Sequence, residues 1–300
     1  MTTARTLAWQ RTRKAGAASL REFWRSTPGR IGIIVLGVFV LMALAAPLIS
    51  SRELLNPVAA RLAGLPQWAS PGDFGPLGTD QLRRPVWDQF VWGSRISLFV
   101  GLAATILTMA IGSIVGIVSG FVGGKLDSAL MRITEWFLVI PFLPLAIVLA
   151  AVLGRSVWIM IFVIGITSWP STARLVRSQV LTVKQRAFVD RSRSLGASGF
   201  HVVRQHILPN VSGLILANTT LSVPISILTE TTLSFLGLGN PGTASWGKTL
   251  EEAFSSGAIS RNAWWYYLPA GLGIVAVVLA FTLIGQTLEK IVDPRLAERR

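Results

Sequence analysis

The sequence predicts an all-α integral membrane protein with six transmembrane helices, both termini in the cytoplasm, and a cytoplasmic helix pair between the fourth and fifth spans. Three observations predict this class. The 300-residue chain is 51% hydrophobic and only 14% charged, whereas soluble domains carry about a quarter charged residues. It contains six apolar stretches of about 20 residues, the length that crosses roughly 30 Å of hydrocarbon. Its basic residues are distributed unevenly between the connections.

The six apolar stretches are expected to be helices. Backbone groups in lipid must form hydrogen bonds within the protein, and these runs are too long for barrel strands. The first has no charged residue and exceeds the 7–15 apolar residues of a cleaved secretory signal, which is the weaker alternative. The fourth is the shortest and contains Pro170. The predicted spans are Ile31–Ser50, Ile96–Phe121, Ala129–Leu153, Val157–Ala173, Val211–Leu236 and Tyr266–Leu288.

Lysine and arginine residues indicate the orientation of the spans. Of the 28, 20 lie on the side of the N-terminus, and basic connections stay in the cytoplasm. The net charge of +14 is then mostly a topology signal, and no nucleic-acid partner is expected because no segment offers a folded basic face. The predicted divisions are a cytoplasmic leader (1–30), the first span (31–50), an extracytoplasmic loop (51–95), a five-helix core (96–288) with a cytoplasmic segment (181–210) and an outer loop (237–263), and a cytoplasmic tail (289–300).

The chain offers few groups for catalysis or for binding metals. It has no cysteine and only two histidines, His201 and His206. Residues five apart do not share a face of an α-helix, so these two are predicted to be a poor metal pair. No nucleophile and base can be assembled near the membrane, and the segments outside it are too short for a catalytic domain. We therefore expect a non-enzymatic chain that binds no cofactor or metal, and any motor must lie on another chain.

One apparent nucleotide motif is expected to be a coincidence. Residues 242–249 satisfy the phosphate-loop pattern G-x-x-x-x-G-K-[ST]. That pattern needs a strand leading into a glycine-rich turn at a helix start. Here a predicted transmembrane helix precedes it, and Trp246 is bulky where the loop must close tightly. No nucleotide site is predicted.

A carboxylate lies inside the fifth predicted span. Glu230 would be costly facing lipid, so it should face a partner, a cavity or another subunit. Under one hypothesis, Glu230 lines or gates a pathway. Under the other, it is a hydrogen-bonded structural link, or tie, between helices. Pro224, six residues earlier, is expected to kink the same helix.

The cytoplasmic stretch 188–210 is the most informative part of the chain. Its apolar residues recur at helical spacing on two faces, Phe188, Ser192 and Leu195 on the first and Phe200, Val203 and Ile207 on the second. A bend at Gly196–Gly199 separates the faces, and the second ends at Pro209. The pattern predicts two short amphipathic helices. They lie either on the membrane surface or against a cytoplasmic partner.

These residues carry a resemblance to a known family. An acidic residue precedes two usually small residues, a glycine follows, and Leu-Pro comes about a dozen positions later; this sequence has Asp190, Arg191, Ser192, Gly196, Leu208 and Pro209 there. Residues 76–82 with 93–97, 233–239 and 245–247 supply three further motifs in the same order. The chain resembles the permease subunits of ATP-binding-cassette importers of the dipeptide, oligopeptide and nickel class. It departs at Arg191, where a small residue is usual, and at Arg83 and Pro85, which replace a glycine and an aspartate beside Arg84.

The resemblance implies which residues meet the motor. The ATPase-coupling residues would be Phe188, Asp190, Arg191, Ser192, Gly196, Leu208 and Pro209, and Glu230 and Pro224 remain possible pathway or gate residues. Gly196 would allow the bend. ATP and magnesium would be bound by partner ATPases and not by this chain.

The resemblance also implies partners and a cargo. The partners would be a second homologous permease, two ATP-binding-cassette ATPase subunits, an extracytoplasmic substrate-binding protein and the lipid bilayer of the cell membrane. The expected substrate is a short peptide, with nickel chelates, glutathione and haem as alternatives within the class. Two other classes stay open, namely a stand-alone channel or ion-driven carrier, and a membrane anchor that recruits a cytoplasmic protein.

Overall fold

A computed structural model describes residues 21–292, and within that range the regular secondary structure is helical, apart from one isolated bridge between Thr79 and Pro85. The parts of the predicted leader and tail at 1–20 and 293–300 lie outside the described residues. Five helices are long and apolar enough to cross a membrane, or six spans if one bent pair is counted. The five are α2 (Thr27–Ile49), α4 (Val86–Val122), α7 (Val157–Lys184), α10 (Leu208–Leu233) and α12 (Trp264–Val292).

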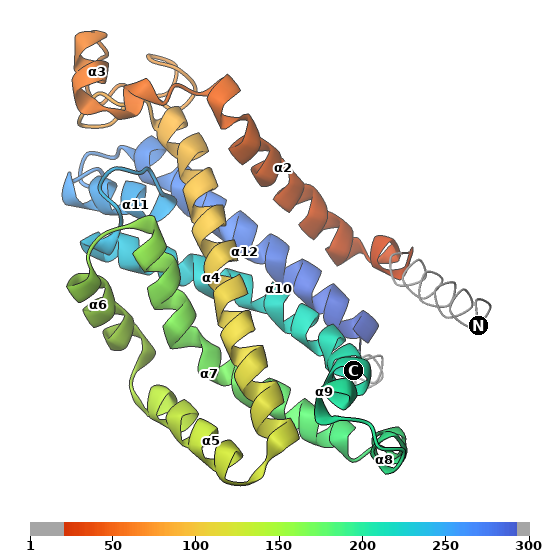
Figure 1. The fold of residues 1–300 in the computed structure, drawn as a ribbon. Coiled ribbons are helices and arrows are strands. Elements are labelled where there is room, and N and C mark those ends of the chain that lie inside the picture. Colours follow the sequence, from red (N-terminus) through yellow and green to blue (C-terminus); the bar gives the residue numbers. More distant parts are fainter. Residues whose placement is uncertain (1–20, 293–300) are drawn as a thin grey trace.

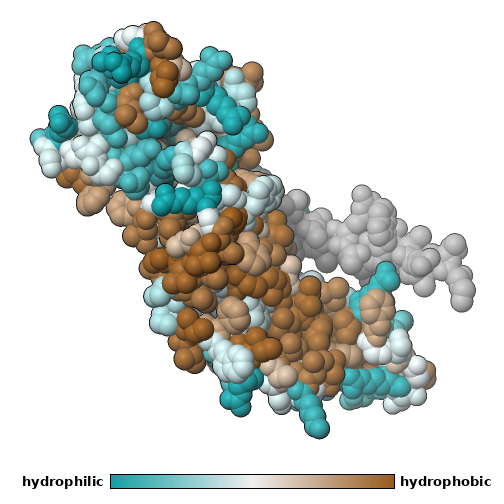
Figure 2. Space-filling model, turned by 60° about the vertical axis from the view of Figure 1, so that its left-hand side comes forward, coloured by the Kyte–Doolittle hydropathy of each residue, from teal (hydrophilic) through white to brown (hydrophobic). Residues whose placement is uncertain are grey.

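The long helices form one bundle, in which α4 packs most extensively against α7 and α10 packs against both α4 and α12 (Figure 1). Figure 2 shows apolar side chains gathered around the middle of the molecule and polar ones toward its ends. This is the distribution expected of a protein whose middle lies in hydrocarbon. The prediction of an all-α membrane protein is confirmed.

The third predicted span is not one continuous helix. Residues Gly124–Val139 form α5 and Phe142–Leu153 form α6, and the two are bent by 90°. Pro141 explains the break, because proline disfavours helical geometry in the residue before it. Ile140 is extended, with φ −72° and ψ 125°.

Two other helices are longer than predicted. Helix α4 begins at Val86, ten residues before the predicted Ile96, and α7 continues beyond Ala173 to Lys184. Pro170 therefore lies inside α7 without ending it. As a result, basic residues that were assigned to a connection, such as Arg177, lie on a helix that extends past the apolar region.

Three glycines set the close approach of α4 and α7. Gly112, Gly116 and Gly120 are spaced four apart, so they share one face of α4. A Cβ at Gly116 would lie 2.6 Å from the carbonyl oxygen of Ala173, and one at Gly112 would lie 2.8 Å from that of Trp169. Small residues at this spacing let helix backbones pack closely in membranes. These glycines, which we call the glycine seam, thus join α4, which follows the 51–85 segment, to α7, which leads into the segment between α7 and α10.

The outer end is built around a buried tryptophan. Trp246 begins α11 (Trp246–Ser255), is fully buried, and donates through its indole N–H to the carbonyl of Phe90 at 3.0 Å. The rings of Trp246 and Phe90 stack with centroids 5.8 Å apart. Gly93 and Gly273 leave the space that the indole fills, since a Cβ at either would approach it to 2.9 or 3.2 Å. The outer loop is thus packed into the bundle.

Residues 242–249, which match the phosphate-loop pattern, take part in this packing. The π-helical turn η3 (Ser234–Leu238), and not a strand, precedes residues 242–249. The amide of Lys248 donates to Ser245 Oγ at 3.3 Å, and the Lys248 ammonium lies 3.7 Å from Glu252. The amide and the ammonium of Lys248 are therefore both engaged within the chain, and the segment before the motif is not the strand that a phosphate loop requires.

Candidate functional site

The segment between α7 and α10, which the sequence predicts to be cytoplasmic, forms a helical knob at the opposite end of the bundle from α3 (Pro57–Leu62) (Figure 1). Helix α7 leads into α8 (Ala187–Ser194), and a turn at Gly196 leads into α9 (Gly199–Val202). We call residues 187–207 the knob. The prediction of two short helices joined by a bend is confirmed. The predicted end at Pro209 is wrong, because the chain passes through the π-helical turn η2 (Val203–Ile207) directly into α10. Proline is tolerated there, since amides in the first helical turn have no intrahelical partner.

Valines attach the knob to the bundle. Val189 and Val202 are fully buried and pack with Val176 and Val180 of α7 and with Ile207. The predicted apolar face of the first helix points outward instead, and Phe188 and Leu195 are 42% and 84% exposed. The second predicted face divides, because Phe200 is 76% exposed whereas Ile207 is buried. Three large apolar side chains are left at the surface of the knob.

The other signature residues surround this apolar surface. Asp190, Arg191 and Gly196 are exposed, and Ser192 is half-buried. Gly196 has φ +83°, and a Cβ there would meet nothing within 4 Å. Glycine is therefore needed for its left-handed backbone, and not to make room for a neighbour. Leu208 and Pro209 lie at the start of α10, where they join the knob to the membrane helix.

The two histidines lie together, contrary to the prediction. Their ring centroids are 6.3 Å apart, and His206 also contacts Phe188, with centroids 5.7 Å apart. The turn η2 is the reason, because a π-helical turn makes residues five apart neighbours. Two imidazoles provide half of a tetrahedral metal site. Within residues 21–292 no third histidine, aspartate or glutamate joins them.

Phe121, at the end of α4, packs against the knob. The Arg193 guanidinium lies 5.1 Å from the centre of the Phe121 ring, and a Cβ at Gly199 would lie 3.3 Å from that ring. Lys184 donates to the Phe121 carbonyl at 2.7 Å. A displacement of the knob would therefore be transmitted to α4 through Phe121, as well as to α7 and α10.

A bidentate ion pair stiffens the base of this region. Arg177 of α7 donates to both carboxylate oxygens of Asp127 in α5, at 2.7 Å each, and Ser119 of α4 also donates to Asp127. Bidentate pairs fix geometry as well as adding energy. Three helices are thus held together where α7 leaves the bundle.

Glu230 lies in the packed interior near the outer end of α10 and is 2% exposed. Its two carboxylate oxygens accept hydrogen bonds from Ser97 of α4 at 3.1 Å and from Ser234 at 2.8 Å. Ser97 in turn accepts the amide of Trp246 at 3.2 Å. This geometry favours the tie between helices over an exposed lining residue. Pro224 is buried within α10, which continues through it.

An ion-pair network that was not predicted from the sequence lies in the layer formed by the 51–85 loop and α11. Asp80 accepts hydrogen bonds from Arg84 Nε at 2.7 Å and from Gln89 at 3.0 Å, and Arg84 reaches Glu252 of α11 at 2.5 Å. Burial raises the pKa of Asp80, while Arg84 acts in the opposite direction. Burial alone would lower the pKa of Arg84, but Asp80 and Glu252 outweigh it and raise that pKa. The network fastens the 51–85 loop to α11.

The two departures beside Arg84 have structural consequences. Arg83 has φ +69°, the left-handed region in which glycine is favoured and other residues are strained. Its guanidinium donates to the Leu65 carbonyl at 2.8 Å, which offsets part of that cost. Pro85 occupies the N-cap of α4 without a side-chain cap, where an aspartate would accept a backbone amide.

The structure thus shows an all-helical membrane protein that carries a surface knob on the connection between two long helices. Residues 112–298 match the family described as binding-protein-dependent transport system inner membrane component, and the chain belongs to this family. The match includes the knob and the helices α7, α10 and α12. The family resemblance seen in the sequence is confirmed.

Curated relatives extend the similarity to most of the chain. It is 37% identical over 272 residues to the oligopeptide transport system permease protein OppC of Bacillus subtilis, covering 89% of this chain and 85% of that protein. It is 35% identical to the dipeptide transport system permease protein DppC of the same organism, covering 88% and 81%. A putative peptide transport system permease protein of Brucella suis is 34% identical, covering 92% and 90%.

Proposed function

We propose that this chain is the membrane permease subunit of an ATP-driven importer and that it forms, with a second related permease, the pathway for short peptides. The relatives at 34–37% identity are named for oligopeptide, dipeptide or peptide transport. The observation that carries the proposal is the knob, whose exposed Phe188, Leu195 and Phe200 form an apolar surface suited to contact with a partner protein. The chain itself is non-catalytic, and ATP and magnesium are bound by the partners.

The coupling step follows from how the knob is held. A cytoplasmic ATPase subunit receives the knob through the apolar residues and through Asp190, Arg191 and Ser192. Because the knob continues into α7 and α10 without a flexible linker, a rigid-body shift of the ATPase moves both helices. Leu208 and Pro209 stand at the junction with α10. Rocking of these helices against the second permease opens the pathway alternately to each side.

Orientation completes the proposal. The knob, the leader and the tail lie in the cytoplasm of a cell with this chain in its plasma membrane, as the excess of lysine and arginine on that side indicates. The outer layer, with α3 and α11, then faces the extracytoplasmic binding protein that delivers the cargo.

The alternative functions have weaker support. An ion-driven carrier would use Glu230 to hold the coupling ion. However, both carboxylate oxygens of Glu230 already accept hydrogen bonds from serine hydroxyl groups. Nickel chelates, glutathione and haem remain alternatives as cargo, because the binding protein selects what is delivered. A simple membrane anchor would have no use for an outer layer tied so firmly to the bundle.

Co-purification from the native membrane tests the proposal. The tagged chain, extracted in mild detergent, should bring a second permease and ATPase chains whose hydrolysis is stimulated by the binding protein. In liposomes this complex should import labelled di- to pentapeptides only with ATP inside. Recovery of the chain alone, moving solute without ATP, would instead establish a channel or carrier.

A further inference from the structure

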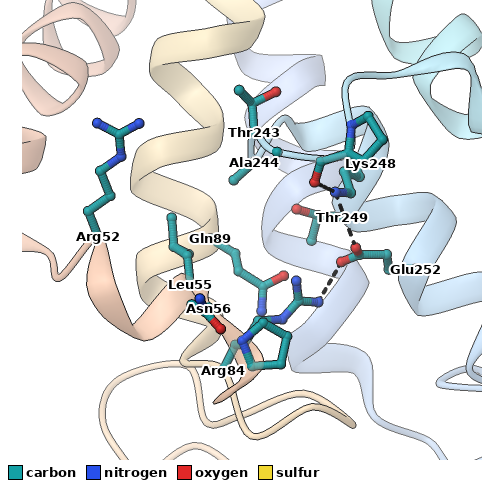
Figure 3. A pocket seen from close by; sticks show the side chains of 13 residues that line it. Arg52, Leu55, Asn56, Arg84, Gln89, Thr243, Ala244, Lys248, Thr249 and Glu252 are labelled. Carbon is teal, nitrogen blue, oxygen red and sulfur yellow. Dashed lines mark hydrogen bonds and ion pairs between the residues drawn. The ribbon is translucent and has the colours of Figure 1, made fainter. Parts of the chain in front are cut away.

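Two neighbouring cavities open on the outer face, between the loop after α2, the start of α4, and residues 241–244. Their volumes are about 340 and 540 Å³. Both are lined by Arg52, Leu55 and the segment 242–244, so they form one basin, which we call the outer basin. Figure 3 shows Arg52 on one side of the smaller cavity, with Thr243, Lys248 and Glu252 across from it. Volumes of this order fit small ligands.

The outer basin has an excess of positive charge. Its lining includes Arg52, Arg84, Arg95 and Lys248 but only one acid, Glu252. Glu252 is already engaged, because Arg84 lies 2.5 Å and Lys248 lies 3.7 Å from it. Among the described residues, no carboxylate lies within 4.0 Å of the Arg52 or Arg95 guanidinium.

Both unneutralised arginines contact the same aromatic ring. The guanidinium of Arg52 lies 5.5 Å and that of Arg95 lies 5.7 Å from the centre of the Trp92 ring, within the range of cation–π attraction. All three residues line the larger cavity. A carboxylate in this cavity would therefore lie beside two guanidiniums, the side chains that bind carboxylates most strongly.

We propose that the outer basin binds the C-terminal carboxylate of a peptide as it leaves the binding protein and before it enters the pathway. The inference rests on the proposed function, since it takes a peptide as the cargo. A concave basin suits a small ligand better than the convex surface of a docking protein. Residues 242–244 line both cavities opposite the arginines and would contact the rest of the peptide.

The test measures binding of trialanine and of trialanine amide to the purified complex without its binding protein, by isothermal titration calorimetry. The wild-type complex should bind the free acid about tenfold more tightly, a difference of about 1.4 kcal/mol. Arg52→Gln and Arg95→Gln should each remove this discrimination by weakening only the free acid, and Arg52→Lys should keep part of it. Arg61→Gln, an exposed arginine on α3 outside the basin, is the matched control and should leave both affinities unchanged.

Other outcomes separate the explanations. Equal binding of the two peptides by the wild-type complex would overturn the carboxylate site, while ATP-dependent peptide uptake measured in parallel would leave the importer intact. Absence of peptide uptake by the wild-type complex would refute the proposed function itself. If Arg52→Gln abolished stimulation of hydrolysis by the binding protein but kept the peptide discrimination, the arginines would serve protein docking and the proposal would be wrong.

Discussion

The Arg84 guanidinium lies 2.5 Å from the Glu252 carboxylate across 168 residues of sequence. This contact joins the loop after the first span to the helix before the last one. Asp80, four residues before Arg84, is fully buried and completes the network. The 51–85 loop and α11 therefore form one connected layer, and a displacement of either segment is transmitted to the other.

Removing the arginine should cost more than removing Glu252. Arg84→Gln leaves Asp80 without a cation and Glu252 with only Lys248, 3.7 Å away, and loss of one partner of a buried pair costs about 3–5 kcal/mol. Glu252→Gln leaves Arg84 paired with Asp80 and should cost less. Thermal unfolding of the purified chain in detergent measures both, with Glu251→Gln as the control because Glu251 makes no ion pair in the described structure. Equal losses for Arg84→Gln and Glu251→Gln would contradict this account.

The glycine seam should be intolerant of even one methyl group. Gly116→Ala would place a Cβ 2.6 Å from the Ala173 carbonyl oxygen, so α4 and α7 would have to separate. Overpacking of this kind typically costs about 1–3 kcal/mol. Gly271→Ala in α12 is the matched control, because its Cβ meets nothing within 4 Å and alanine favours a helix. We expect a lower midpoint of thermal unfolding for the first variant only. A stable Gly116→Ala protein would mean that the seam is looser than the structure shows.

Local patterns in the sequence predicted the helical class, most of the spans and the two helices of the knob. The errors lie where geometry depends on a single residue or on distant partners. Ile140–Pro141 bends the third span although the apolar run is continuous, and the turn at Val203–Ile207 brings together two histidines that α-helical spacing separates. The Arg84–Glu252 pair could not be inferred from one sequence, since nothing local connects residues so far apart.

Glu230 distinguishes a structural tie from a gate. Glu230→Gln keeps the size of the side chain. Its amide oxygen accepts a hydrogen bond from one serine hydroxyl, and its amide nitrogen donates to the hydroxyl oxygen of the other, so both serines keep a partner. A tie predicts transport and stability close to wild type, whereas Glu230→Leu should be destabilised because Ser97 and Ser234 lose their acceptor. Uptake rate and thermal stability are measured together. Loss of uptake in Glu230→Gln at unchanged stability would refute the structural role and support a role of Glu230 as a gate residue of the pathway.

Gly196 tests the coupling role of the knob through its backbone alone. At φ +83° with open space around it, Gly196→Ala introduces strain but no clash, at a cost of about 1–2 kcal/mol. That strain favours a different turn between α8 and α9, so the knob should meet the ATPase in the wrong orientation and hydrolysis should continue with little uptake. Gly124→Ala is the matched control, since Gly124 has φ +60° and open space but is the first residue of α5, outside the knob. The ratio of peptide imported to ATP hydrolysed in proteoliposomes is the readout. This ratio should fall severalfold in Gly196→Ala and stay unchanged in Gly124→Ala. Equal ratios in the two variants would show that the turn in the knob does not take part in coupling.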